Sequence, residues 1–192
     1  MLPKKRYQRI GSARHSSADY RKLLSEKEFL QVQKRARGIG VDLVSIDFEG
    51  FELRFRTKSQ SRKGVYYTEI IQFSELTPED IVSGKDIGSL LRSAKMKVYC
   101  TSPAYIFWGY AYKNWRYGCG LFPERRYPKV RNPHLRGWVD KHLYAVLMTF
   151  PFLVSHIGKH LKKYWTEKQQ EDFQKSLDKI SKDISLDELL DS

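Results

Sequence analysis

The chain has 192 residues, with 35 Lys and Arg against 22 Asp and Glu, so its formal net charge is +13. A composition of 41% hydrophobic and 30% charged residues is typical of a folded protein, and one domain with tails is expected. The excess of positive charge favours phosphate backbones, anionic surfaces or acidic proteins as partners.

Two classes of protein are disfavoured. The first residues are basic, but no apolar segment of a secretory signal follows them, and the apolar run 143–154 is too short to span a bilayer. The only cysteines in the sequence, Cys100 and Cys119, cannot build the disulfide framework of a small secreted protein. We therefore expect no membrane partner and a reducing compartment.

The composition of residues 1–17 predicts a mobile basic arm, because this segment is rich in Lys, Arg, Ser and Gly and lacks apolar periodicity. Two interpretations remain open for this arm. It is either a solvated tail or a segment that lies on nucleic acid or on a neighbouring subunit. Its cations are Lys4, Lys5, Arg6, Arg9 and Arg14.

The next part of the chain predicts a helix followed by a sheet. Apolar residues near helical spacing predict a helix over about 17–37. Val, Ile, Phe, Tyr and Thr in partial alternation then predict strands over 41–48, 51–57 and 65–73, separated by turn and loop residues. This pattern indicates an antiparallel meander.

Two short helices and a further strand follow. Thr77 and Pro78, with acidic residues after them, predict a helix start, and 86–94 repeats a short helical pattern. A short strand is expected over 96–100. We therefore predict an α+β fold with a small antiparallel sheet of about four strands.

The segment 103–117 has aromatic residues at helical spacing and predicts a helix that packs on the sheet. Base stacking is a second interpretation, because Lys113 and Arg116 lie among the rings. The rings that would stack are Tyr105, Trp108, Tyr112 and Trp115.

Residues 118–137 predict a long basic loop. Three prolines interrupt it, and a connection of this length without secondary structure is usually functional or held by other parts of a protein. We expect it to bind nucleic acid or a protein partner. Its cations are Arg125, Arg126, Lys129, Arg131 and Arg136.

A helical C-terminal half is expected after this loop. The pattern predicts helices over 139–150 and 153–163, broken at Pro151, and a last helix over 166–184 before an acidic end. We divide the chain into the arm 1–17, a single α+β domain over 18–165, and a C-terminal helix with an acidic tail over 166–192.

Two short motifs have the spacing of a metal site. A Cys-x-Cys pair after a strand and a distant Cys-x-His at a helix start would bind zinc tetrahedrally. Here the four positions are Cys100, Ser102, Asp140 and His142, and serine is a poor zinc ligand. We expect no tightly held zinc and no other cofactor, with packing and hydrogen bonds joining the two elements instead. Cys119 is the alternative thiolate.

The stretch 41–163 resembles a SWIM-type zinc-finger module, as it occurs in structural and uncharacterised proteins of tailed bacteriophages. The pieces that carry the resemblance are Val98-Tyr99-Cys100-Thr101-Ser102-Pro103-Ala104-Tyr105, Arg131-Asn132-Pro133-His134-Leu135-Arg136-Gly137 and Asp140-Lys141-His142-Leu143-Tyr144-Ala145-Val146-Leu147. Two of the four ligand positions depart from the pattern of the family. The resemblance implies contacts with DNA or with other proteins.

Enzymatic activity is not expected. Cys100 and His142 form a conceivable thiol and base pair, but no orienting partner or oxyanion element accompanies them. The sequence has no glycine-rich phosphate loop, and the basic loop has few acidic neighbours that would bind a nuclease metal.

The leading functional hypothesis follows from the resemblance. The chain is expected to be a non-enzymatic structural component of a tailed-bacteriophage virion, made in the host cytoplasm and associated with the head, connector or tail. It would contact other virion subunits, with DNA as a further partner. The alternative is a small basic nucleic-acid-binding regulator of phage infection, supported by the charge of the arm and the loop.

Overall fold

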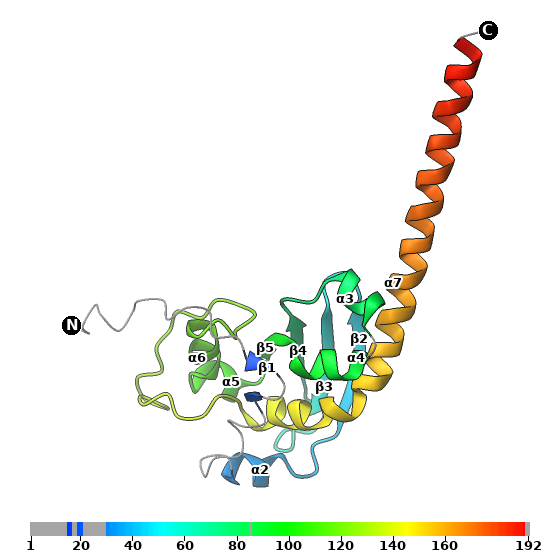
Figure 1. Ribbon diagram of the computed structural model, residues 1–192. Coiled ribbons are helices and arrows are strands. Elements are labelled where there is room, and N and C mark those ends of the chain that lie inside the picture. The colour runs from blue at the N-terminus through cyan, green and yellow to red at the C-terminus, as the bar shows by residue number, and fades with distance from the viewer. Residues whose placement is uncertain (1–14, 17–18, 21–29, 85, 191–192) are drawn as a thin grey trace.

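The computed structural model describes residues 15–16, 19–20, 30–84 and 86–190, with side chains at 19–20, 30–84 and 86–179. The predicted α+β fold is confirmed: an antiparallel sheet is followed by a helical C-terminal half (Figure 1). The sheet has the order β1-β5-β4-β3-β2, in which β1 contributes two residues. Its strands are β1 (His15–Ser16), β2 (Val41–Asp47), β3 (Glu52–Lys58), β4 (Tyr66–Phe73) and β5 (Lys95–Cys100).

The meander β2-β3-β4 forms where the alternating pattern predicted it. Asp47 ends β2, and its carboxylate accepts hydrogen bonds from the backbone N–H groups of Glu49 and Gly50, which fixes the turn into β3. Along β3, Leu53, Phe55 and Thr57 are buried while Arg54 and Arg56 between them are exposed, so one face of the sheet carries the core.

Two short helices, α3 (Pro78–Ser83) and α4 (Ile87–Ser93), connect β4 to β5. The predicted start of α3 is confirmed by a capping box between Thr77 and Asp80. Asp86 caps α4. Both helices pack against the long C-terminal helix, and α4 comes so close to it that a Cβ at Gly158 would lie 2.6 Å from Cγ2 of Ile87.

The prediction of one aromatic helix over 103–117 is wrong, because two helices occupy this segment. They are α5 (Pro103–Phe107) and α6 (Tyr110–Arg116). Gly109 separates them with a φ of 82°, a conformation that favours glycine. A side chain could not fit there, because a Cβ would lie 2.2 Å from Cγ of Pro128 in the basic loop. The close approach of that loop therefore determines where the helix is interrupted.

The prediction of three C-terminal helices is also wrong, because a single helix, α7 (Lys141–Leu190), continues through Pro151. Residues on both sides of the proline, including Phe150 and Val154, are buried, and this packing outweighs the hydrogen bond that proline removes. Figure 1 shows α7 bending where its yellow part passes into its orange part, the region in which Pro151 lies. Among the described residues, no helix is both long and apolar enough to cross a membrane.

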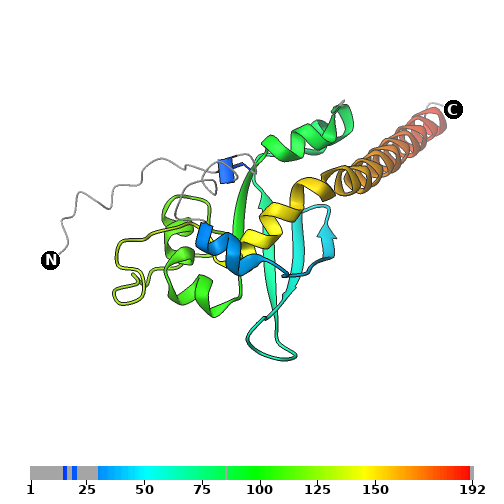
Figure 2. The ribbon, with the colours of Figure 1, turned by 90° about the horizontal axis from the view of Figure 1, so that it is seen from below.

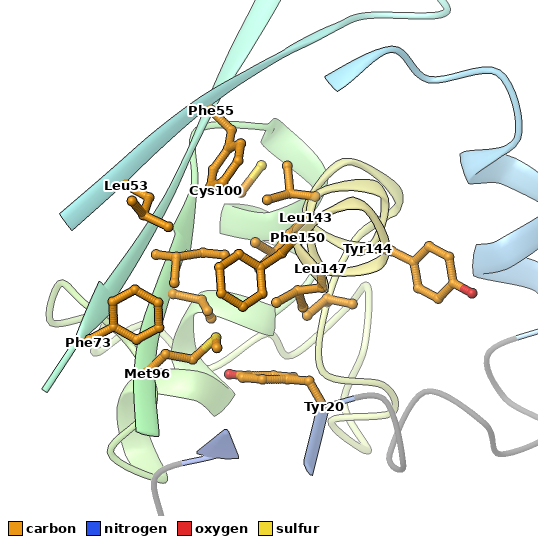
Figure 3. Close-up of a cluster of buried hydrophobic side chains, with 14 of the residues drawn as sticks. Tyr20, Leu53, Phe55, Phe73, Met96, Cys100, Leu143, Tyr144, Leu147 and Phe150 are labelled. Atoms are coloured by element: carbon orange, nitrogen blue, oxygen red, sulfur yellow. The ribbon is translucent and has the colours of Figure 1, made fainter. Parts of the chain in front are cut away.

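The core lies between the sheet and the first part of α7. Figure 3 shows side chains of α7 facing those of β3, β4 and β5, with Tyr20 closing one side. The Tyr20 hydroxyl donates to Oδ1 of Asn114 at 2.9 Å, which ties the N-terminal segment to α6. The shorter helix α2 (Leu30–Ala36) packs against α7 and lies in front of it when the molecule is seen from below (Figure 2). Of the predicted helix over 17–37, residues 17–18 and 21–29 lie outside the described residues.

Candidate functional site

The four positions with metal-ligand spacing lie where β5, α5 and α7 meet, and two of them are helix caps. Ser102 caps α5 by accepting a hydrogen bond from the backbone N–H of Tyr105 at 3.1 Å. Asp140 caps α7 by accepting from the N–H of Leu143 at 3.0 Å. The Ser102 hydroxyl donates to the Asp140 carboxylate at 2.6 Å. Ser102 and Asp140 thus each accept a hydrogen bond from a backbone N–H group in the first turn of α5 or α7. The bond between their side chains joins the two helix starts directly.

A second buried chain of hydrogen bonds joins His142 to the sheet. The Thr57 hydroxyl lies 2.8 Å from Oε1 of Glu69 and 2.9 Å from Nδ1 of His142. Thr57 has a single hydroxyl hydrogen, so it donates in one of these contacts and accepts in the other. The ring of Tyr67 meets His142 edge-on at 4.6 Å between centroids. Three adjacent elements, β3, β4 and α7, are therefore linked through side chains.

Glu69 is the member of this network that the sequence analysis missed. Its side chain is fully buried, and its Oε2 atom has no hydrogen-bond partner among the described residues. Burial, assisted by the charge of Asp140, raises the pKa of Glu69 to about 8, so the carboxyl group is neutral at pH 7. The sequence does contain a signal for this burial, because Glu69 occupies an inward position between Tyr67 and Ile71 in an alternating strand.

Cys100 packs within the same network as a neutral thiol. Its sulfur accepts from the N–H of Ser102 at 3.3 Å and lies 3.5 Å from Oε1 of Glu69. Burial, together with the charges of Asp140 and Glu69, raises the pKa of the Cys100 thiol well above its usual value. A buried thiol with a raised pKa is a poor nucleophile at neutral pH.

The pattern of hydrogen bonds also bears on metal binding. Among the described residues, no three or more His, Cys, Asp and Glu side chains are grouped so that they could hold a metal ion. His142 directs Nδ1 to Thr57, and Asp140 uses both carboxylate oxygens in the caps. Cys119, the alternative thiolate, is buried with its sulfur 3.5 Å from the carbonyl oxygen of Tyr117. The arrangement joins secondary-structure elements by hydrogen bonds.

The cations of the N-terminal arm, Lys4, Lys5, Arg6, Arg9 and Arg14, lie outside the described residues. Those of the basic loop are exposed and fall into two groups. Arg126 is held by Glu124, whose carboxylate it contacts at 2.9 and 2.6 Å. In the part of the chain that the structure describes, the other cations form no ion pair: Arg125, Lys129, Arg131 and Arg136.

The loop itself is held by α6. The ammonium group of Lys113 donates to the carbonyl oxygens of Leu135 at 2.9 Å and Gly137 at 3.0 Å. Asn114 donates to the carbonyl oxygen of Trp138 at 2.6 Å. These contacts explain how a segment with so little secondary structure keeps a defined path around α5 and α6 (Figure 1).

The base-stacking interpretation is wrong for two of its four rings. Tyr105 is fully buried, with its hydroxyl donating to the carbonyl oxygen of Val98, and Tyr112 is buried against Tyr127. Trp108 and Trp115 are each 36% exposed, so their surfaces remain accessible. The aromatic segment is mainly a packing element, as its first interpretation stated.

Comparisons of the chain with protein-family models, with curated proteins and with solved structures gave no match. The resemblance to a SWIM-type module therefore stays a prediction, as do the domain boundaries at residues 17 and 165.

Proposed function

We propose that the chain is a non-enzymatic structural component of a tailed-bacteriophage virion, which contacts other virion subunits through the end of α7. The bacteriophage context comes from the sequence resemblance. The observation that carries the proposal is the part of α7 beyond the body of the protein, where every described side chain from Gln169 to Lys179 is exposed. Figure 1 shows this part projecting away from the sheet.

The last contacts between α7 and the body that the structure describes are made by three side chains in two successive helical turns. Tyr164 stacks on Phe48 with ring centroids 4.7 Å apart, and Trp165 stacks on Phe51 at 5.8 Å. Lys168 forms an ion pair with Glu49 in the same turn between β2 and β3. The helix is therefore anchored up to Lys168, and every described side chain beyond that point is exposed.

The projecting part has the features of a helix that packs on another chain. Phe173 and Leu177 lie four residues apart, hence on one side of the helix, and are 65% and 43% exposed. In the sequence, Ile180 and Ile184 follow them, so successive apolar residues of this stripe are four, three and four residues apart. Most helices in proteins are stabilised by tertiary packing of an apolar stripe, and this stripe lacks such packing within the described chain.

Purified particles provide the direct test. Mass spectrometry should find the chain at a fixed ratio to the major virion proteins, and its absence would contradict the proposal. In complementation, Phe173→Ser with Leu177→Ser should lower incorporation into particles, because the apolar stripe is lost. The matched control, Lys175→Ser with Lys179→Ser, changes the opposite side of the same turns and should be incorporated normally.

A second function, DNA binding through the basic loop, is favoured by cations there that form no ion pair with a described residue. Arg125, Lys129 and Arg131 are exposed and are carried by a loop that α6 holds in place. Replacing these three by Ala should weaken binding of duplex DNA and reduce the dependence of log Kd on log salt by about 3. The matched control is Arg126→Ala, whose guanidinium already pairs with Glu124. An unchanged salt dependence in the triple variant would exclude this function for the loop.

A further inference from the structure

A second basic surface lies at the start of α7, where three segments distant in sequence meet. The side chain of Gln60, in the loop between β3 and β4, joins them. Its Nε2 donates to the carbonyl oxygen of Arg37 at 3.0 Å, just after α2. Its Oε1 accepts from the ammonium group of Lys141 at 2.7 Å, at the first residue of α7. Figure 2 looks onto α2 and the loop between β3 and β4 from this side.

The three segments bring seven cations to this surface, which we call the Gln60 junction. All are exposed except Lys141, which is partly buried by its contact with Gln60. The cations come from α2 and the residues after it, from the end of β3 and its loop, and from the start of α7. They are Lys34, Arg35, Arg37, Lys58, Arg62, Lys63 and Lys141.

The positive charge of the Gln60 junction is not balanced by its own residues. Within the segments 30–41, 58–66 and 136–142 the one acidic residue is Asp140, which is buried and bonded to Ser102. Among the described residues, none of the seven cations forms an ion pair.

The sheet next to the junction shows the opposite arrangement. Asp42, which follows the first of these segments, pairs with Arg56 at 3.5 Å on the outer face of the sheet. Arg54 on the same face pairs with Glu52 at 2.7 Å. The two arginines on this face of the sheet are thus paired with carboxylates, whereas the cations of the junction form no ion pair among the described residues.

We propose that the Gln60 junction binds the phosphate backbone of nucleic acid, at a site separate from the basic loop. Three elements carry its cations, so they are spread over a surface, as contacts with successive phosphates require. Protein interfaces usually have an apolar centre depleted in charge, whereas this surface is rich in Lys and Arg. Its contacts would be independent of base sequence, because phosphates alone are recognised.

The geometry of the loop supports a preformed site. The N–H of Ser59 donates to the carbonyl oxygen of Val65 at 2.8 Å, and the N–H of Arg62 donates to Oγ of Ser59 at 3.2 Å. These bonds, together with the two bonds of Gln60, fix the loop before any ligand binds. Preorganised cations lose less conformational entropy on binding than cations on a free tail.

The test uses the full chain and a short mixed-sequence DNA duplex, with Kd measured across a salt series. Replacing Lys58, Arg62 and Lys63 by Ala should reduce the slope of log Kd against log salt by about 3 and weaken binding roughly a hundredfold at about 0.15 M salt. The matched control removes three exposed lysines of α7, Lys159, Lys163 and Lys175. Its slope should change by less than one.

Two further variants separate the possible outcomes. The charge-preserving variant with Lys58→Arg, Arg62→Lys and Lys63→Arg should bind DNA like the wild type, which distinguishes lost charge from a misfolded loop. A loop variant, with Arg125, Lys129 and Arg131 replaced by Ala, should retain the full contribution of the Gln60 junction.

The proposal is overturned if the Lys58, Arg62 and Lys63 variant keeps the wild-type slope. In that case a slope lost only in the loop variant would still support the second function proposed above. Binding of wild type to vesicles of anionic phospholipid, without binding to the duplex, would also overturn it. Neither result bears on incorporation into particles, which tests the projecting helix.

Discussion

The two parts of α7 differ in what stabilises them. From Leu143 to Ile157 the helix buries an apolar face against the sheet, and its first turn is capped by Asp140. From Gln169 to Lys179 every side chain of the same helix is exposed, although its sequence still places Phe173 and Leu177 on one side. A helix of continuous geometry can therefore serve as core in one part and as contact surface in the other.

The largest expected effect comes from the core part. Leu147→Ala should lower the free energy of unfolding by about 2–5 kcal/mol, because it removes a buried side chain and leaves a cavity beneath the sheet. Leu177→Ala in the projecting part should change it by less than about 0.5 kcal/mol. Denaturant unfolding of both variants measures this difference. Equal losses would show that Leu177 is packed within the chain.

Glu69 makes stability depend on pH. Burial raises the pKa of Glu69 from its usual value of 4.5 to about 8, so between these pH values the folded state binds more protons than the unfolded state. The stability it contributes is present below pH 4.5 and is lost as pH rises to 8, by up to about 1.4 kcal/mol per pH unit. Glu69→Gln should flatten this part of the stability curve. A slope that survives in Glu69→Gln would assign the dependence to another group.

The cap of α7 has a smaller effect. Asp140→Ala removes the cap and leaves the Ser102 hydroxyl without its acceptor, so the free energy of unfolding should fall by about 1–3 kcal/mol. Asp140→Asn keeps one acceptor oxygen for the N–H of Leu143, and its amide N–H group can donate to the Ser102 hydroxyl, so its free energy of unfolding should fall less. Thermal unfolding of the two variants with wild type checks the order. If the free energy of unfolding falls equally in both variants, the negative charge of Asp140 matters more for stability than its hydrogen bonds.

Local patterns were sufficient to predict most of the sheet. Strands β2 to β5 lie where β-branched and aromatic residues alternate, and the start of α3 lies at the Thr77 and Pro78 signal. These features depend on neighbouring residues, such as the capping box of Thr77 with Asp80. They can be predicted because the residues whose interactions determine them lie close together in the sequence.

Features that depend on distant contacts were not predictable. The interruption at Gly109 is determined by Pro128, and the continuation of α7 through Pro151 depends on packing under the sheet. Oε1 of Glu69 lies beside Thr57 and Cys100, which are 12 and 31 residues away. The sequence motif identified Ser102 and Asp140, whereas their bond to each other follows from the fold.

The smallest effect on stability is expected from removing the projecting part altogether. A chain that ends at Lys168 keeps the contacts of Tyr164 and Trp165 with the β2–β3 turn, so its melting temperature should match that of the full chain. Its incorporation into particles should nevertheless be lost, because the stripe of Phe173 and Leu177 is absent. A large fall in melting temperature would show that the projecting part packs within the chain. Unchanged incorporation would place the assembly contact on the body of the protein.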